Sequence, residues 1–175
     1  ELQDRRRSHI LQPLEPGKIC KGYQITGEKM KILLTAINAK YIHTCPAVYS
    51  LKAYAQAHSH SLPDIQIAEF TINDRYQDIL AGIISAQADV IAFSTYIWNI
   101  VPVRRLIQDI RLIKGRDVLI WAGGPEASYA PEDFLEKTGA DLVMLGEGEV
   151  TFSRLAEWLL KNGNVSPSDP WHCFL

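Results

Sequence analysis

The sequence predicts a three-layer α/β fold in which a parallel five-stranded sheet lies between two layers of helices. Five short apolar segments alternate with segments in which apolar residues recur at helical spacing. Three of the apolar segments begin with an aspartate, at Asp89, Asp117 and Asp141, and end in small or polar residues. Strands that alternate with helices in this way form parallel sheets with helices on both faces.

The clearest strand is the apolar segment 118–122, which runs directly into Gly123 and Gly124. A continuous apolar run is typical of a strand that is covered on both faces. Glycine permits φ > 0 where the chain leaves the sheet and lets a ligand approach the backbone closely. Because open parallel sheets bind ligands outside the carboxyl ends of their strands, this corner is a candidate binding site.

The other elements follow in chain order. Strands are expected at residues 31–37, 64–70, 89–94, 118–122 and 141–145. Helices are expected to begin near Pro46, Asp74, Pro102, Pro131 and Glu149. Proline fits the first helical turn, Asp74 is a suitable N-cap, and acidic residues suit the positive end of the helix dipole. This order predicts a flavodoxin-like (Rossmann-like) sheet with strand order 2-1-3-4-5 and its switch point between strands one and three.

Composition and cysteine usage limit the kind of protein. The chain has 175 residues, which suits one domain, expected at residues 30–163. Residues 1–29 are expected to be a mobile N-terminal extension, and residues 164–175 an irregular tail. A net charge of -2 gives no indication of a nucleic-acid or membrane-surface partner, and no apolar run is long enough to span a bilayer. Cys20, Cys45 and Cys173 form no CxxC pair, which favours a reduced, cytoplasmic compartment.

Several ligand classes are excluded by missing motifs. The first strand is not followed by GxGxxG, and the chain contains no GxxxxGK[ST], so neither the dinucleotide fingerprint nor the P-loop is present. The first strand ends without the acidic residues of a response-regulator receiver. The loop that follows it lacks the glycine expected of a flavin phosphate loop.

The loops at the predicted carboxyl edge span residues 38–44, 94–99, 123–129 and 146–149. They contain the aromatic residues Tyr41, Tyr96, Trp98 and Tyr129, and the hydroxyl residues Thr44, Ser94 and Thr95. This set suits a large amphipathic ligand that binds through backbone and hydroxyl groups. Tyr96 and Trp98 are more often packing residues than ligand contacts. The two glycines are also explained by a tight strand exit, and Glu147 by a helix cap.

Residues from Met30 to about Lys161 resemble the N-terminal cobalamin-binding domain of cobalamin-dependent radical SAM proteins. The resemblance is carried by KILLTAINAKYIHT, EFTIND, DVIAFSTYIWNI, GGPEASY and DLVMLGEGEVTF. It implies cofactor contacts at Asn38, Tyr41, His43, Thr44, Ser94, Thr95, Tyr96, Trp98, Gly123, Gly124, Pro125, Glu126, Gly146 and Glu147. It further implies that the dimethylbenzimidazole tail lies beside Ser94 and the paired glycines, and that the corrin ring lies over the carboxyl edge.

Two departures from the family pattern shape the functional expectation. Cobalamin modules of the DxHxxG type ligate cobalt through a histidine; here His43 lies in the corresponding loop without the preceding aspartate. Base-off binding without a histidine ligand is therefore expected, with a bond from His43 to cobalt as the alternative. The chain also lacks CxxxCxxC, the motif that holds the [4Fe–4S] cluster of radical SAM enzymes.

The chain alone is therefore not expected to be catalytic. The resemblance implies a radical SAM catalytic domain, in cis or in trans, that supplies the [4Fe–4S] cluster and S-adenosylmethionine and acts on a small-molecule substrate. The complete enzyme would be a methyltransferase or an oxidoreductase. Two other interpretations remain open: a flavodoxin-like domain that binds a nucleotide or flavin, and a non-catalytic interaction module of the same fold.

Overall fold

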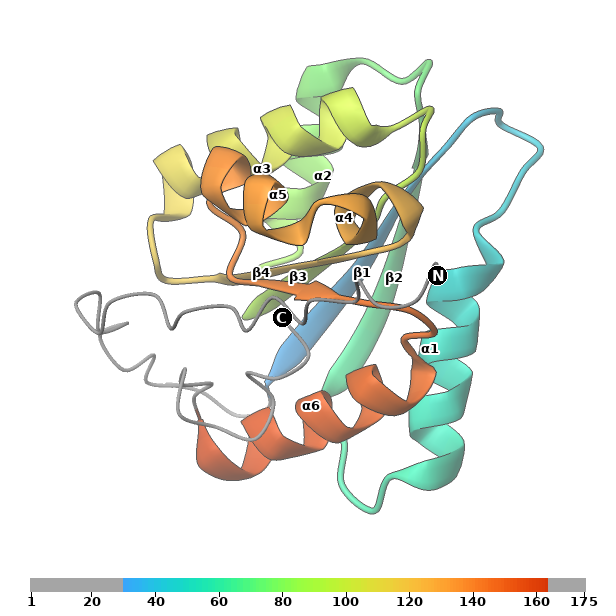
Figure 1. The fold of residues 1–175 in the computed structure, drawn as a ribbon, viewed down its shortest axis with the longest axis vertical. Helices are drawn as coiled ribbons and strands as arrows, with labels where there is room; N and C mark the ends of the chain where they lie inside the picture. Colours follow the sequence, from blue (N-terminus) through green and yellow to red (C-terminus); the bar gives the residue numbers. More distant parts are fainter. Residues whose placement is uncertain (1–29, 164–175) are drawn as a thin grey trace, which may run out of the picture.

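The computed structural model describes residues 30–163 of the chain. The predicted extension 1–29 and tail 164–175 lie outside the described residues. The strands are β1 (Lys31–Asn38), β2 (Asp64–Thr71), β3 (Val90–Ser94), β4 (Leu119–Gly123) and β5 (Leu142–Met144). They form one parallel sheet in the order β2-β1-β3-β4-β5, which confirms the predicted topology (Figure 1).

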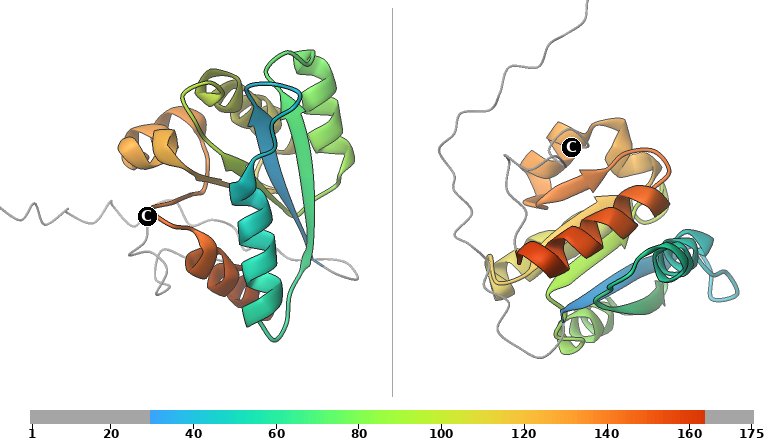
Figure 2. Two further views of the ribbon diagram at one scale, coloured as in Figure 1. Left: turned by 90° about the vertical axis from the view of Figure 1, so that its right-hand side faces the viewer. Right: turned by 90° about the horizontal axis from the view of Figure 1, so that it is seen from below.

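Helices cover both faces of this sheet (Figures 1 and 2). One layer contains α1 (Pro46–His58) and α6 (Glu149–Asn162). The other contains α2 (Tyr76–Ser85), α3 (Ile100–Lys114), α4 (Pro125–Tyr129) and α5 (Pro131–Thr138). Within residues 30–163, no helix combines the length and the apolar character that crossing a bilayer requires.

Two details differ from the sequence prediction. Residues 123–129 were expected to form a loop, but five of them form α4, with Gly124 as the N-cap and a proline in the first turn. Helix α2 begins at Tyr76 with Arg75 as its N-cap residue, so the prediction that Asp74 caps it is wrong. The carboxylate of Asp74 instead accepts a hydrogen bond from Thr71 N at 2.7 Å and closes the turn after β2.

The alternation of side chains along β1 divides the core into two parts. Leu33 and Ile37 pack toward α2 and α3, whereas Ile32 and Leu34 pack toward α1 and α6. Full burial of each such side chain stabilises the fold by roughly 1.5–3 kcal/mol. The sheet is therefore a well-packed platform that holds the loops at its carboxyl edge.

Candidate functional site

The carboxyl ends of β3, β4 and β5 lie side by side. Ser94 pairs with Gly123, and Gly123 pairs with Met144, in the parallel register of these three strands. The sequence prediction that Ser94 and Gly123 meet at one edge is thus confirmed by the strand register. A Cβ atom added at Gly123 would lie 3.7 Å from Met144, which is an ordinary contact distance.

Thr95 and Gly124 form the turn that leads into α4. Thr95 donates to the carbonyl oxygen of Gly123 from both its backbone N and its Oγ1, each at 2.7 Å. The same hydroxyl oxygen accepts a hydrogen bond from Ala127 N at 2.9 Å. Gly124 has φ 99°, and a Cβ there would lie 2.5 Å from Thr95 O. The fold itself therefore requires glycine at position 124 and engages the buried Thr95 hydroxyl internally.

The loop between β3 and α3 is held by Asn99, a residue absent from the sequence-predicted site. Its side-chain amide donates to Ile37 O and to Ser94 O, each at 3.0 Å, and its Oδ1 accepts from Tyr96 N at 2.8 Å. Asn99 is 1% exposed. It joins the ends of β1 and β3 at the switch point of the sheet. The sequence placed Asn99 in the carboxyl-edge loop 94–99 and in the family motif DVIAFSTYIWNI, but its position directly before a helix suggested no more than a cap.

Two aromatic side chains of this loop stack over the switch point. The rings of Tyr96 and Trp98 lie 4.6 Å apart with an interplanar angle of 3°. Trp98 is 43% exposed and donates from Nε1 to Ile37 O at 3.2 Å. Partial burial, followed by the nearby Cys45 thiol, raises the pKa of Tyr96. That thiol lies 3.5 Å from Ser94 Oγ. Cys45 is therefore, like Asn99, a neighbour of Ser94 that was not among the sequence-predicted site residues.

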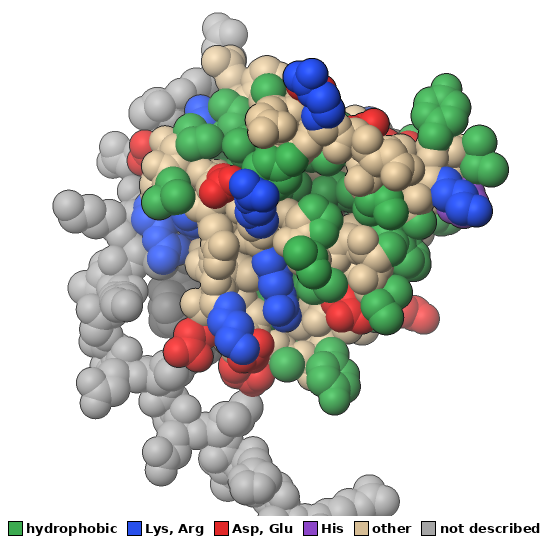
Figure 3. Space-filling model, turned by 90° about the horizontal axis from the view of Figure 1, so that it is seen from above, with side chains coloured by type: hydrophobic (Ala, Val, Ile, Leu, Met, Phe, Trp, Pro, Cys, Tyr) green, Lys and Arg blue, Asp and Glu red, His purple; other side chains and the backbone are tan. Residues whose placement is uncertain are grey.

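The loop between β1 and α1 separates into a buried start and an exposed middle. Asn38 is buried, and its side-chain amide donates to Glu69 Oε1 at 3.0 Å. Tyr41 is 88% exposed, and His43 and Thr44 are also exposed. Among the described residues, the His43 ring has no hydrogen-bond partner. The loop between β1 and α1 lies on the right of the molecule in Figure 1. Seen from above, apolar, basic and histidine side chains lie together at the right-hand rim (Figure 3).

The loops after β4 and β5 complete the edge. Pro125 and Glu147 are exposed, and Glu126 is partly exposed. Gly146 has a positive φ of 71°, and the space beside it is open. A hydrogen bond of 2.8 Å from Ser50 Oγ to the first residue of α6, Glu149, connects this side of the edge to α1. The predicted contact residues thus border one continuous edge, although Asn38 and Thr95 direct their polar groups into the protein.

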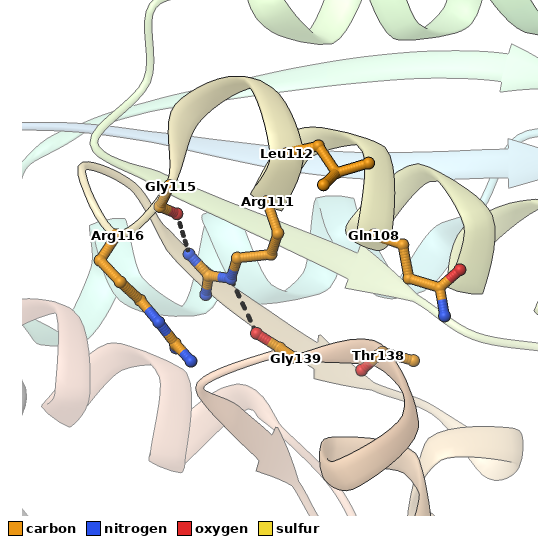
Figure 4. Close-up of a pocket in the computed structure, with 7 residues that line it drawn as sticks. All are labelled: Gln108, Arg111, Leu112, Gly115, Arg116, Thr138 and Gly139. Carbon is orange, nitrogen blue, oxygen red and sulfur yellow. Dashed lines mark hydrogen bonds between the residues drawn. The ribbon is translucent and has the colours of Figure 1, made fainter. Parts of the chain in front are cut away.

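A hollow of about 520 Å³ lies elsewhere, at the amino end of the sheet (Figure 4). Its central side chain is Arg111, which donates to Gly139 O at 2.7 Å, Gly115 O at 3.0 Å and Val118 O at 2.7 Å. Arg111 also forms an ion pair with Asp141. Because its guanidinium group is engaged in these structural contacts, the hollow is a weaker ligand site than the carboxyl edge.

Comparison with known proteins identifies similarity over most of the described residues. A family model described as a B12 binding domain matches residues 32–156. A cobalamin-dependent radical SAM methyltransferase, TokK from Streptomyces tokunonensis, is 40% identical over 82 residues, which is 45% of this chain and 11% of TokK. The matched segment thus spans about a tenth of the length of that relative.

Solved structures with a similar fold include two proteins whose names refer to cobalamin. The methyltransferase TsrM from Kitasatospora setae, solved with cobalamin and a [4Fe–4S] cluster bound, has a TM-score of 0.62 at 16% identity, covering 82% of this chain and 26% of TsrM. A cobalamin-binding protein from Desulfitobacterium hafniense has a TM-score of 0.53 at 14% identity, covering 74% of this chain and 58% of that protein. At these identities the likeness shows the fold alone.

Proposed function

This chain belongs to the B12-binding domain family, and from that premise we propose that it binds cobalamin at the carboxyl edge as part of a radical SAM methyltransferase. The observation that carries the proposal is the family match over residues 32–156, which includes the ends of β1, β3, β4 and β5. The relationship to TokK favours methyl transfer over other radical chemistry.

The proposed position of the cofactor follows the chemistry of the edge. Tyr41 and Trp98 offer exposed aromatic surface on which the corrin ring would lie. For the nucleotide tail, Ser94 offers a hydroxyl group, and Gly123, its partner in the strand register, has no side chain. The residues present therefore fit a large amphipathic ligand that needs few charged partners.

We expect base-off binding in which no protein histidine ligates cobalt. His43 is exposed, and no carboxylate among the described residues orients its ring. Histidine ligands of metals ordinarily donate their second ring nitrogen to a carboxylate, carbonyl or water. When bound, cobalamin would supply the methyl-transfer chemistry, and this chain would orient it and shield its lower face.

The catalytic part of the enzyme is proposed to be a radical SAM domain in cis or in trans. TokK and TsrM are much longer than their match to this chain. That domain would hold the [4Fe–4S] cluster and S-adenosylmethionine and would bind the small-molecule substrate above the corrin.

The proposal is tested by mixing the purified protein with hydroxocobalamin and recording the visible spectrum after gel filtration. Co-elution of the corrin with the protein is expected, and folded protein that elutes without corrin would disprove the proposal. The axial ligand is tested by electron paramagnetic resonance of bound cob(II)alamin, because a nitrogen ligand further splits each cobalt line. We expect no such splitting, and the same spectrum for His43→Ala.

A further inference from the structure

The loop between β1 and α1 is held at both of its ends by one side chain on a third element. Glu69 lies near the carboxyl end of β2, and its Oε1 accepts hydrogen bonds from Asn38 Nδ2 at 3.0 Å and from Cys45 N at 2.9 Å. Asn38 is the last residue of β1, and Cys45 is the N-cap residue of α1. A single carboxylate oxygen therefore connects the residues that enter and leave the loop.

The second carboxylate oxygen extends this anchor to the helix. Glu69 Oε2 accepts a hydrogen bond from Tyr49 OH at 2.6 Å, and Tyr49 lies in the first turn of α1. Between the two anchored ends, residues 40–44 are exposed, and a hydrogen bond from His43 N to Lys40 O at 3.1 Å closes a turn. The conformation of the exposed middle thus depends on contacts made at its ends.

The three hydrogen-bond donors around Glu69 favour the ionised form of its carboxylate. Partial burial alone would raise the pKa of Glu69, but the hydrogen bonds from Tyr49, Asn38 and Cys45 N outweigh it and lower that pKa. The titratable groups that belong to this cluster are the Tyr49 hydroxyl and the Cys45 thiol. Among the described residues, no Lys, Arg or His side chain forms an ion pair with Glu69. Hydrogen bonds to an ionised acceptor are about twice as strong as neutral ones.

We propose that Glu69 is a positioning residue for cobalamin binding, because it fixes the loop that presents Tyr41, His43 and Thr44 to the corrin. The inference rests on the proposed function. Glu69 does not touch the cofactor in this scheme; it acts through the loop. Its role resembles that of outer-shell groups at metal sites, whose removal typically weakens binding by about 10–100-fold.

The first test measures the loop without any cofactor. Lys40 is exposed in the loop and offers trypsin a cleavage site there. In Glu69→Gln we expect cleavage after Lys40, followed by mass spectrometry, to be several-fold faster than in the wild type. Cleavage after Lys114, at the end of α3, serves as the internal standard for global opening and is expected to keep its rate. Equal cleavage after Lys40 in both proteins would overturn the inference.

The second test measures binding. Titration with hydroxocobalamin, followed by visible absorbance, is expected to give about tenfold weaker binding for Glu69→Gln. Glu157→Gln is the matched control, because Glu157 is also a carboxylate with a lowered pKa but pairs with Lys161 on the surface of α6. It is expected to bind like the wild type. Wild-type protein that does not bind would refute the proposed function, whereas equal binding by wild type and Glu69→Gln would refute only the role of Glu69.

Discussion

The amino and carboxyl ends of the sheet differ in how their polar and aromatic groups are used. At the amino end, Arg111 and Asp141 are nearly buried, with side chains 12% and 15% exposed, and their contacts tie α3 to the start of β5. At the carboxyl end, Tyr41 and Trp98 remain exposed although each could stabilise the fold by burial. The hollow at the amino end therefore surrounds a structural contact, although its lining residue Leu112 is also exposed. The exposed aromatic groups at the carboxyl end are the surface on which we propose that cobalamin binds.

This comparison predicts its largest stability effect at the amino end. Arg111→Met removes the more buried of the two arginine partners of Asp141 and the donor to three carbonyl groups. We expect a loss of about 3–5 kcal/mol in the free energy of unfolding, measured by urea denaturation. Arg116→Met is the comparison, because Arg116 pairs with the other oxygen of Asp141 at 2.8 Å from a side chain that is 69% exposed, and its loss is expected to cost less than about 1 kcal/mol. Equal losses in the two variants would show that the buried contacts of Arg111 stabilise the fold no more than the exposed ion pair of Arg116.

A second prediction separates the two glycines of the carboxyl end. Gly124→Ala would bring a Cβ to 2.5 Å from Thr95 O at a positive φ, so a loss of stability of about 2–3 kcal/mol is expected in urea denaturation. Gly123→Ala makes only ordinary contacts, so its stability should change by less than about 1 kcal/mol. Its affinity for hydroxocobalamin should nevertheless fall. Unchanged affinity in Gly123→Ala would argue against the proposed tail position.

The third prediction concerns pH and the anchored loop. Because the pKa of Glu69 is lowered from 4.5 in the folded protein, its stabilising contribution is complete above that value and is lost as the pH falls through the folded pKa. The difference in free energy of unfolding between wild type and Glu69→Gln should therefore be constant near neutrality and shrink in acid. Urea denaturation at a series of pH values measures it. A difference that does not change with pH would mean that Glu69 is not stabilised in its ionised form.

The smallest stability effect is expected at the exposed aromatic surface. Tyr41→Ser should change the free energy of unfolding by no more than about 0.5 kcal/mol, because the side chain is 88% exposed. Its affinity for hydroxocobalamin should fall measurably in the same visible titration. If binding were unchanged, the corrin would have to lie away from this loop, and the contrast between the two ends of the sheet would lose its functional meaning.

Much of the fold was predictable because it depends on local periodicity. Apolar runs and helical spacing were enough to predict the strand order and to bring Ser94 and Gly123 together, since parallel strands end at a common edge. Helix α4 was missed because five residues that begin at a glycine and a proline are too few to show a helical period. The family motifs span strand ends and the segments that follow them, so their positions follow from the strand order.

The residues that shape the edge were decided by the tertiary structure. Glu69 meets donors 20, 24 and 31 positions away, and Asn99 meets Ile37 across 62 positions. No local pattern specifies such partners, because a hydrogen bond depends on where the chain returns in space. The same holds for Thr95, whose hydroxyl looked available to a ligand and is used within the protein. Sequence periodicity thus located the edge, and packing determined which of its polar groups hold the protein together and which remain for a ligand.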